Sequence, residues 1–177
     1  TEMPQSYGLN GSEGAEVGDV NGDGKLDVVA VGTDFAVVLL GNGDGTFNQQ
    51  GNFGVSGDYS RGIDLGDLDG DGDLDAFVVN AQAGQLNSIF PPSPDRVFRN
   101  DGAGNFSPDP ETYGDNEAGW DVELGDLDGD GDLDAFVANW HSEPDQVYFN
   151  DGDGSFTISP QVFPDWPDRN VSLYDMD

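Results

Sequence analysis

The sequence predicts an all-β fold built from repeated blades of four antiparallel strands, and three observations support this prediction. The phrase GDLDGDGDLDAFV occurs twice, starting at Gly66 and at Gly125, and the near copy GDVNGDGKLDVVA starts at Gly18. Each copy runs into a β-rich segment and then reaches a Gly/Asp turn such as NDGAGNF. The first aspartates of the copies, with a fourth start at Asp175, lie 48, 59 and 49 residues apart, which is a period typical of propeller blades.

Each repeat contains four expected strands. A short strand enters the acidic phrase, a β-rich run such as DAFVVN leaves it, and a third strand (FAVVLL, RVFRN or QVYFN) precedes the turn. Glycine, Asn and Asp in the turn allow the positive φ that hairpins need, and a less regular fourth strand follows. Four antiparallel strands per period make one β-propeller blade.

The connection between the second and third strands varies in length. It has three residues in the first repeat, about fourteen in the second (AQAGQLNSIFPPSP) and about six in the third. Long connections are where function tends to lie, although a tolerated insertion is the alternative.

We interpret the chain as a single repeat domain, residues 1–177. Its expected parts are the end of a preceding blade (1–14), three blades (15–58, 59–116 and 117–168) and the start of a fourth (169–177).

The charge balance excludes several kinds of partner. Five Lys and Arg residues stand against 36 Asp and Glu, which gives a formal net charge of -31. Nucleic acid and anionic membrane surfaces need a basic surface that this chain lacks. Self-repulsion of this size opposes folding unless cations neutralise it, so we expect a folded but cation-dependent chain.

Composition also restricts the metal chemistry and the location. The chain has no cysteine and one histidine, which disfavours disulfides and zinc sites. No apolar run reaches the roughly 20 residues of a membrane span, and the first residues lack the order of a signal peptide. Because the chain begins with Thr1 rather than Met, we expect it to have been processed or trimmed.

The acidic phrase has the spacing of a calcium loop. Oxygen-bearing side chains recur at positions 1, 3, 5 and 9, with glycines between them where the chain must turn sharply. Position 7 varies between Lys25 and aspartate, which fits a ligand contributed by the backbone carbonyl. Solvated Asp/Gly turns are the alternative, but three copies in register favour three Ca²⁺ sites per chain, and magnesium fits less well.

The expected metal-site residues are Asp19, Asn21, Asp23, Lys25 and Asp27; Asp67, Asp69, Asp71, Asp73 and Asp75; and Asp126, Asp128, Asp130, Asp132 and Asp134. At position 8, Leu26, Leu74 and Leu133 are expected to point into the core of their own blade.

At the stretches DVNGDGKLD, DLDGDGDLD and NDGAGNF, the chain resembles the FG-GAP/VCBS repeats of integrin-type β-propellers. The resemblance covers nearly the whole chain. It implies that the calcium loops join the first and second strands on one face of the disc, and that ligand is carried on the opposite face. Such propellers serve as adhesion heads, lectins and modules of secreted enzymes, so the resemblance does not name the ligand.

By the same resemblance, aromatic residues are expected near the ligand-carrying face, where they would stack on sugars or peptide. These candidate ligand residues are Tyr59, Tyr113, Trp120, Trp140 and Trp166, with His141 beside them. For Trp120 and Trp166, packing between blades is the alternative.

Propellers of this family commonly close with seven blades, so the ring is incomplete in one chain. Either the chain is a fragment of a longer protein or two copies complete a ring, and we favour a homodimer. The preferred function is a calcium-binding module for extracellular binding or adhesion, with a glycan or protein ligand. We expect a secreted bacterial protein.

Two other functions remain open. The sequence lacks GxSxG, HExxH and P-loop motifs. A metal-dependent, promiscuous hydrolase of phosphate or carboxyl esters, at an acidic metal site or a subunit seam with His141 as a weak catalytic candidate, is the enzyme alternative. A purely structural spacer is the third.

Overall fold

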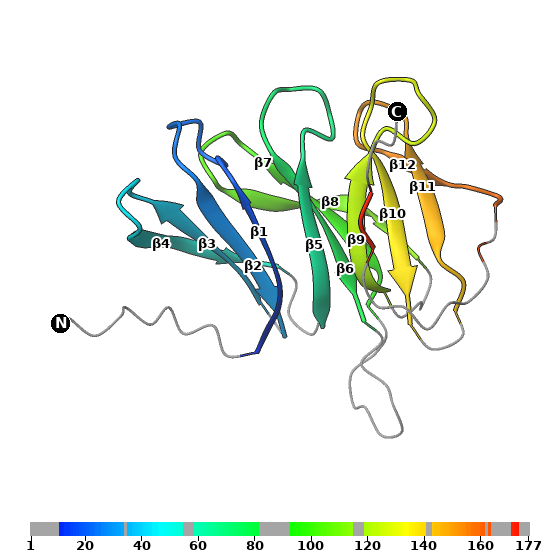
Figure 1. Ribbon diagram of the computed structural model, residues 1–177, viewed down its shortest axis with the longest axis horizontal. Coiled ribbons are helices and arrows are strands. Elements are labelled where there is room, and N and C mark those ends of the chain that lie inside the picture. The colour runs from blue at the N-terminus through cyan, green and yellow to red at the C-terminus, as the bar shows by residue number, and fades with distance from the viewer. Residues whose placement is uncertain are drawn as a thin grey trace.

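The computed structural model describes residues 11–33, 35–54, 59–81, 93–114, 119–140, 143–161, 163 and 171–173. These residues form three separate four-stranded antiparallel sheets (Figure 1). The part of the chain so described has no helix long and apolar enough to cross a membrane. The predicted all-β fold with four strands per repeat is confirmed.

The three sheets, named here the first, second and third blades, each follow chain order. The first contains β1 (Ser12–Gly18), β2 (Asp27–Gly32), β3 (Phe35–Gly41) and β4 (Phe47–Phe53); the second contains β5 (Ser60–Gly66), β6 (Asp75–Asn80), β7 (Asp95–Asn100) and β8 (Phe106–Tyr113); the third contains β9 (Gly119–Gly125), β10 (Asp134–Asn139), β11 (Gln146–Asn150) and β12 (Phe156–Ile158).

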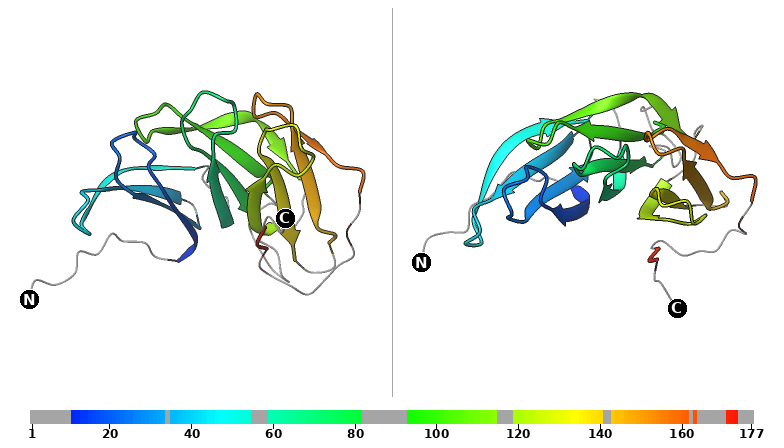
Figure 2. Two further views of the ribbon diagram at one scale, coloured as in Figure 1. Left: turned by 45° about the horizontal axis from the view of Figure 1, so that its top comes forward. Right: turned by 90° about the horizontal axis from the view of Figure 1, so that it is seen from above.

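The blades stand side by side in an open arc. Their first strands, β1, β5 and β9, pack next to one another on the inner side. The last strands, β4, β8 and β12, lie along the outer rim, as the view from above shows (Figure 2). The described residues therefore form part of a propeller ring, with the inner strands facing its axis.

Each second strand is apolar on both faces, and in β6 the two faces belong to the two cores shared with the neighbouring blades. In β2, Val29 and Val31 face the second blade, while Ala30 lies in a separate small cluster with Val37 and Leu39. Strands buried on both faces appear as continuous apolar runs rather than alternating ones. This explains the segments DVVAVG, DAFVVN and DAFVAN.

The main cores lie between blades. One cluster joins the first and second blades and includes Val38 and Phe98. The other joins the second and third blades, where Phe77 contacts Phe156 edge to face with ring centroids 5.2 Å apart and Tyr113 packs beside them. Because these two cores are shared, each blade buries apolar side chains against a neighbouring blade.

The prediction for the position-8 leucines is wrong in one respect. Leu74 and Leu133 pack against the preceding blade, at Gly18 and Gly66, where a Cβ would lie 2.7 Å and 2.6 Å from the leucine Cδ1. Leu26, which has no preceding blade among the described residues, is 67% exposed. The acidic loop lies at the edge of its blade, so its eighth residue reaches the neighbour rather than its own core.

The two ends of the arc have exposed apolar residues at positions that are covered inside it. At loop position 2, Val20 and Leu68 are each 1% exposed because the next blade covers them, whereas Leu127 on the third blade is 38% exposed. Residues 171–173 cover part of the inner strand of the third blade, since Val171 N donates to Asp121 Oδ2 (3.1 Å) and Leu173 lies beside Gly125. With Leu26 at the opposite end, the arc therefore has exposed apolar residues on one blade face at each end.

A buried asparagine joins the first acidic loop to the second blade, and another joins the second loop to the third blade. Asn100 Nδ2 donates to the carbonyl of Val20 in the preceding blade (2.8 Å) and to that of Leu74 in its own loop (3.1 Å). Its Oδ1 accepts from the backbone N–H of Gly104 (3.0 Å). One side chain thus connects two loops and a turn.

Asn150 makes the same three contacts one blade later. Its Nδ2 donates to the carbonyls of Leu68 (2.9 Å) and Leu133 (3.1 Å), and its Oδ1 accepts from Gly154 N (3.0 Å). The first blade has Gly41 at this position and so lacks the bridging side chain. We call Asn100 and Asn150 the bridging asparagines.

Replacing a bridging asparagine is expected to destabilise the fold. In Asn150→Ala, two carbonyls and two backbone N–H groups, those of Gly152 and Gly154, lose their partner, and we expect the free energy of unfolding to fall by about 2–3 kcal/mol. Urea unfolding followed by circular dichroism measures this. The exposed Asn48→Ala is the control, with an expected loss of less than about 0.5 kcal/mol. Equal losses in the two variants would contradict the bridging role.

Candidate metal centres

The three acidic phrases form the connections β1–β2, β5–β6 and β9–β10, which all lie along one edge of the arc (Figure 1). Glycines at positions 4 and 6 have positive φ, as in the second loop at Gly70 (75°) and Gly72 (95°). Only glycine adopts this conformation without strain, so these residues allow the loop to curl on itself. The curl turns the alternating oxygen-bearing side chains toward a common centre.

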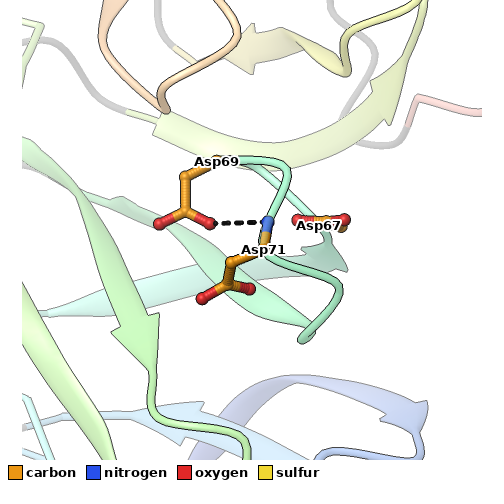
Figure 3. A group of neighbouring side chains, drawn as sticks. All are labelled: Asp67, Asp69 and Asp71. Carbon is orange, nitrogen blue, oxygen red and sulfur yellow. Dashed lines mark hydrogen bonds between the residues drawn. The ribbon is translucent and has the colours of Figure 1, made fainter.

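In the second loop, Asp67, Asp69 and Asp71 each offer a carboxylate oxygen, and these oxygens lie within 4.8 Å of one another (Figure 3). Asp69 Oδ1 accepts from Asp71 N at 3.3 Å, and Asp67 accepts from Gly72 N at 3.1 Å. The carboxylates thus fix the loop that brings them together.

The third loop repeats this geometry. Asp126, Asp128 and Asp130 also have carboxylate oxygens within 4.8 Å of one another. All three residues are exposed, so an ion could reach them from solvent.

The first loop has the same curl with a different donor set. Asp19 Oδ2 accepts from Gly24 N (2.7 Å), and Asn21 Oδ1 accepts from Asp23 N (3.0 Å). An amide oxygen replaces one carboxylate, so the first loop brings less negative charge to its centre.

Position 9 is a fully buried aspartate in each loop. Asp134 accepts from Leu127 N at the start of its loop (2.8 Å) and from Asn150 N on the third strand (2.9 Å). Asp27 makes the equivalent pair, with Val20 N (3.0 Å) and Gly41 N (2.7 Å). This carboxylate closes the loop and anchors it to the blade.

Asp75, the third of these aspartates, has one oxygen to spare. Its Oδ1 accepts from Asn100 N at 2.8 Å, whereas Oδ2 is buried and makes no hydrogen bond within the described residues. Burial raises the pKa of Asp75 to about 6. The Arg99 guanidinium lies 3.6 Å from Oδ2. A buried carboxylate oxygen without a hydrogen bond, beside three further carboxylates, is an arrangement that also fits a bound cation.

The side chains at position 7 lie against the turn of their own blade. The carboxylate of Asp73 lies beside Gly102, and that of Asp132 lies beside Gly152. The aliphatic part of the Lys25 side chain lies beside Gly43. With their side chains beside this turn, these three residues can offer the centre of the loop a backbone carbonyl. This placement fits the predicted carbonyl ligand, and it explains why position 7 accepts both lysine and aspartate.

Two basic side chains distinguish the loops. Lys25 Nζ pairs with Asp23 in the first loop at 2.7 Å. In the second loop, Arg99 on β7 lies 3.0 Å from Asp69 Oδ2 and 3.6 Å from Asp75 Oδ2. No carboxylate of the third loop forms an ion pair within the described part of the chain. Sequence reasoning missed Arg99, since it lies 30 residues from Asp69 along the chain.

The predicted aromatic ligand residues separate into two places. Tyr59, Trp120 and Trp140 gather near Arg61, whose guanidinium lies 4.6 Å from the Tyr59 ring centre and 4.2 Å from that of Trp120. Sequence reasoning missed Arg61. The candidates His141 and Trp166 lie outside the described residues.

Tyr113 lies apart from this group, in the core between the second and third blades. Its ring packs against Phe77, Tyr148 and Phe156, and burial raises its pKa to about 12. It therefore acts as a core residue in this structure.

One of two comparisons with solved structures agrees with this architecture. A lectin of Agrocybe aegerita, whose structure is described as the basis of specific recognition of non-reducing terminal N-acetylglucosamine, superposes with a TM-score of 0.53 at 23% identity, over 85% of this chain and 37% of the lectin. The V. cholerae biofilm matrix protein Bap1 gives a TM-score of 0.35 at 22% identity, over 81% of this chain and 27% of Bap1. The chain thus spans well under half of either protein. No curated protein sequence matches it.

A family model for the FG-GAP-like repeat matches three stretches of the chain, residues 19–78, 86–137 and 126–177. Two of these matches begin at the first aspartate of an acidic loop, and the match over residues 86–137 contains the whole third loop. Together with three blades of four antiparallel strands, the matches identify the chain as a member of the FG-GAP-like repeat family.

Proposed function

We propose that this chain is a calcium-stabilised binding or adhesion module of a secreted protein, with one Ca²⁺ ion in each acidic loop. The observation that carries the proposal is the convergence of three carboxylate oxygens within 4.8 Å, in two of the loops, beside a buried aspartate at position 9. Calcium takes six to eight oxygen ligands, which suits a loop of carboxylates and carbonyls better than magnesium does.

In each loop the proposed ligands are the side chains at positions 1, 3, 5 and 9 and the carbonyl at position 7. When bound, the ion would supply the positive charge that offsets the repulsion among these carboxylates. The loops themselves position the ligands, through the positive-φ glycines and through the hydrogen bonds that the aspartates accept from backbone N–H groups.

Ion binding in this proposal is linked to blade packing. The carbonyl at position 2 of one loop accepts from the bridging asparagine of the next blade, and the aspartate at position 9 accepts from the N–H at that same position 2. An ordered loop would therefore present its carbonyl correctly to the neighbouring blade. Metal binding and folding are coupled where a site forms only in the folded state.

A binding function is favoured over catalysis because the acidic side chains are accounted for by the loop geometry. The lectin's recognition of N-acetylglucosamine places glycans among the ligands to test, next to proteins. Ester hydrolysis through a metal site remains the second candidate, and its proposed residue His141 lies outside the described part of the chain.

We also propose that two copies associate through the open ends of the arc. Leu26 and Leu127 are exposed at opposite ends, whereas their counterparts inside the arc contact a neighbouring blade. A second copy would cover these faces, although the joint at Gly41 would lack a bridging asparagine.

Calcium is expected to bind with a stoichiometry of three ions per chain, measured by isothermal titration calorimetry. Asp130→Asn removes one negatively charged ligand from the third loop. The affinity for one of the three ions should fall by about tenfold or more. Asp151→Asn, on the turn of the same blade, is the matched control and should leave all three unchanged. No calcium binding in the unmodified protein, or an unaltered titration in Asp130→Asn, would contradict the proposal.

The three loops are expected to fill in a fixed order. The third has five aspartates and no basic partner among the described residues, the second has Arg99, and the first has Asn21 and Lys25. Calcium affinity should therefore fall from the third loop to the first. The amide resonances of Gly131, Gly72 and Gly24, followed by NMR during a titration, report each loop separately.

The role of Arg99 is testable by Arg99→Leu, which copies the residue found at Leu40 in the first blade. Removing the positive charge should strengthen calcium binding at the second loop by about tenfold. Arg96→Leu on the same strand is the control. A second loop that binds calcium no more tightly in Arg99→Leu would mean that Arg99 does not oppose the ion.

Association is expected to give a mass near twice the 18.8 kDa of one chain, measured by light scattering in calcium. Leu26→Glu places a charge on one open face and should give a monomer that still binds three ions. Gln49→Glu, on the exposed outer strand β4, adds the same charge and should remain a dimer. A monomeric unmodified protein would refute the dimer but not the calcium sites.

A further inference from the structure

The inner strands carry a β-bulge at the same place in every blade. In β1, Ser12 pairs with Gly32 and Gly14 pairs with Val31, which leaves Glu13 as the extra residue. The same shift leaves Arg61 as the extra residue in β5 and Trp120 in β9. A bulge redirects its side chain and is common beside functional sites. We call Glu13, Arg61 and Trp120 the bulge row.

The bulge row is held together by direct contacts. Arg61 Nη1 lies 3.3 Å from Glu13 Oε2, and its guanidinium lies over the rings of Tyr59 and Trp120. Tyr59 donates its hydroxyl to Glu13 Oε1 at 3.2 Å, and Trp120 meets the edge of Trp140 at 5.0 Å. The polar groups and rings are therefore already positioned relative to one another.

A cavity of about 330 Å³ opens beside the bulge row on the inner side of the arc. Its wall includes Glu16, Ile63 and Asp121 besides the row itself. The volume is at the lower end of the range of about 300–1,000 Å³ for small-molecule sites, which favours one small ligand.

Glycines bring the inner strands close together at this cavity. A Cβ at Gly14 would lie 2.6 Å from the Arg61 carbonyl oxygen, and one at Gly62 would lie 2.9 Å from the Asp121 Cα. Two neighbouring strands therefore approach with bare backbone, and the three bulge residues end up side by side. The cavity lies at the start of the inner strands, whereas the acidic loops follow their ends.

The charges around the cavity restrict its ligand. Glu13 is paired with Arg61, but Glu16 and Asp121 form no ion pair within the described residues. Burial raises the pKa of both, and nearby Asp64 adds to the rise for Glu16. An anionic ligand would meet these two carboxylates, and Arg61 already occupies the position over both rings that a cationic ligand would take. Four charged side chains in the wall also disfavour an apolar ligand.

A neutral molecule with several hydroxyl groups satisfies these restrictions. The guanidinium donates hydrogen bonds in a fixed plane, the carboxylates accept them, and the indole and Ile63 supply apolar surface. Arg61 Nε is buried and has no hydrogen-bond partner among the described residues, so one donor remains for a ligand or a water molecule.

We propose that the cavity beside the bulge row binds one neutral sugar ring, with Glu13, Arg61 and Asp121 pairing with its hydroxyls and Trp120 packing against it. This inference rests on the proposed binding function and names its ligand class and its site. It does not require that calcium touch the sugar.

The test is NMR titration of the calcium-loaded protein with the methyl glycosides of glucose, galactose, mannose, fucose and N-acetylglucosamine, following the Trp120 indole N–H. Methyl glucuronide and N-acetyl-lysine amide serve as the anionic and cationic probes. We expect at least one neutral glycoside to shift the Trp120 resonance and to bind more tightly than either charged probe.

Variants locate the site. Arg61→Gln and Glu13→Gln should each lower the affinity for the glycoside that binds by about tenfold. Arg96→Gln on β7 removes the same charge as Arg61→Gln and should leave this affinity unchanged. Glu13 is exposed, so Glu13→Gln tests the site even if the Arg61 variant is unstable.

The inference is overturned if none of the five glycosides binds, if the charged probes bind more tightly, or if both variants bind as the unmodified protein does. A calcium titration of the same samples separates this failure from that of the proposed function. Three bound ions without sugar binding would leave the calcium-stabilised module intact and remove only the sugar site.

Discussion

A buried aspartate closes each acidic loop, and the position of the loop relative to its blade and to the next blade depends on it. Asp27 and Asp134 each accept one N–H from the start of the loop and one from the third strand. In the first loop, Val20 supplies the first N–H and also offers its carbonyl to Asn100 of the next blade. In the second loop, Leu68 at the same position offers its carbonyl to Asn150. Local loop geometry and packing between blades therefore share the same few hydrogen bonds.

This arrangement collects negative charge at one edge of the arc. A chain with a net charge of -31 gains nothing from carboxylates within 4.8 Å of one another unless a cation compensates them. In the second loop Arg99 supplies part of that compensation from within the chain. The other end of the inner strands has a different character, since its equivalent positions carry an acid, a base and an indole.

The sequence predicts features that depend on nearby residues. The strand order, the curl of the acidic loops and the alternation of their oxygens all follow from spacings of a few residues, and they agree with the structure. Contacts between blades join residues roughly 50 positions apart, so they could not be predicted in the same way. The packing of Leu74 on Gly18, and the placement of Arg61 against Glu13 and Trp120, are of this second kind. A repeat alignment would have shown that Glu13, Arg61 and Trp120 are equivalent, but not that a bulge turns them together.

The central claim is that a calcium ion is a structural part of each acidic loop. A crystal structure grown in calcium, with anomalous difference maps, tests this claim most directly. We predict one anomalous peak in each of the three loops, about 2.3–2.6 Å from oxygens of positions 1, 3, 5 and 9 and from the carbonyl of position 7. Loops of the same shape with water in place of the ion, at millimolar calcium, would contradict the account.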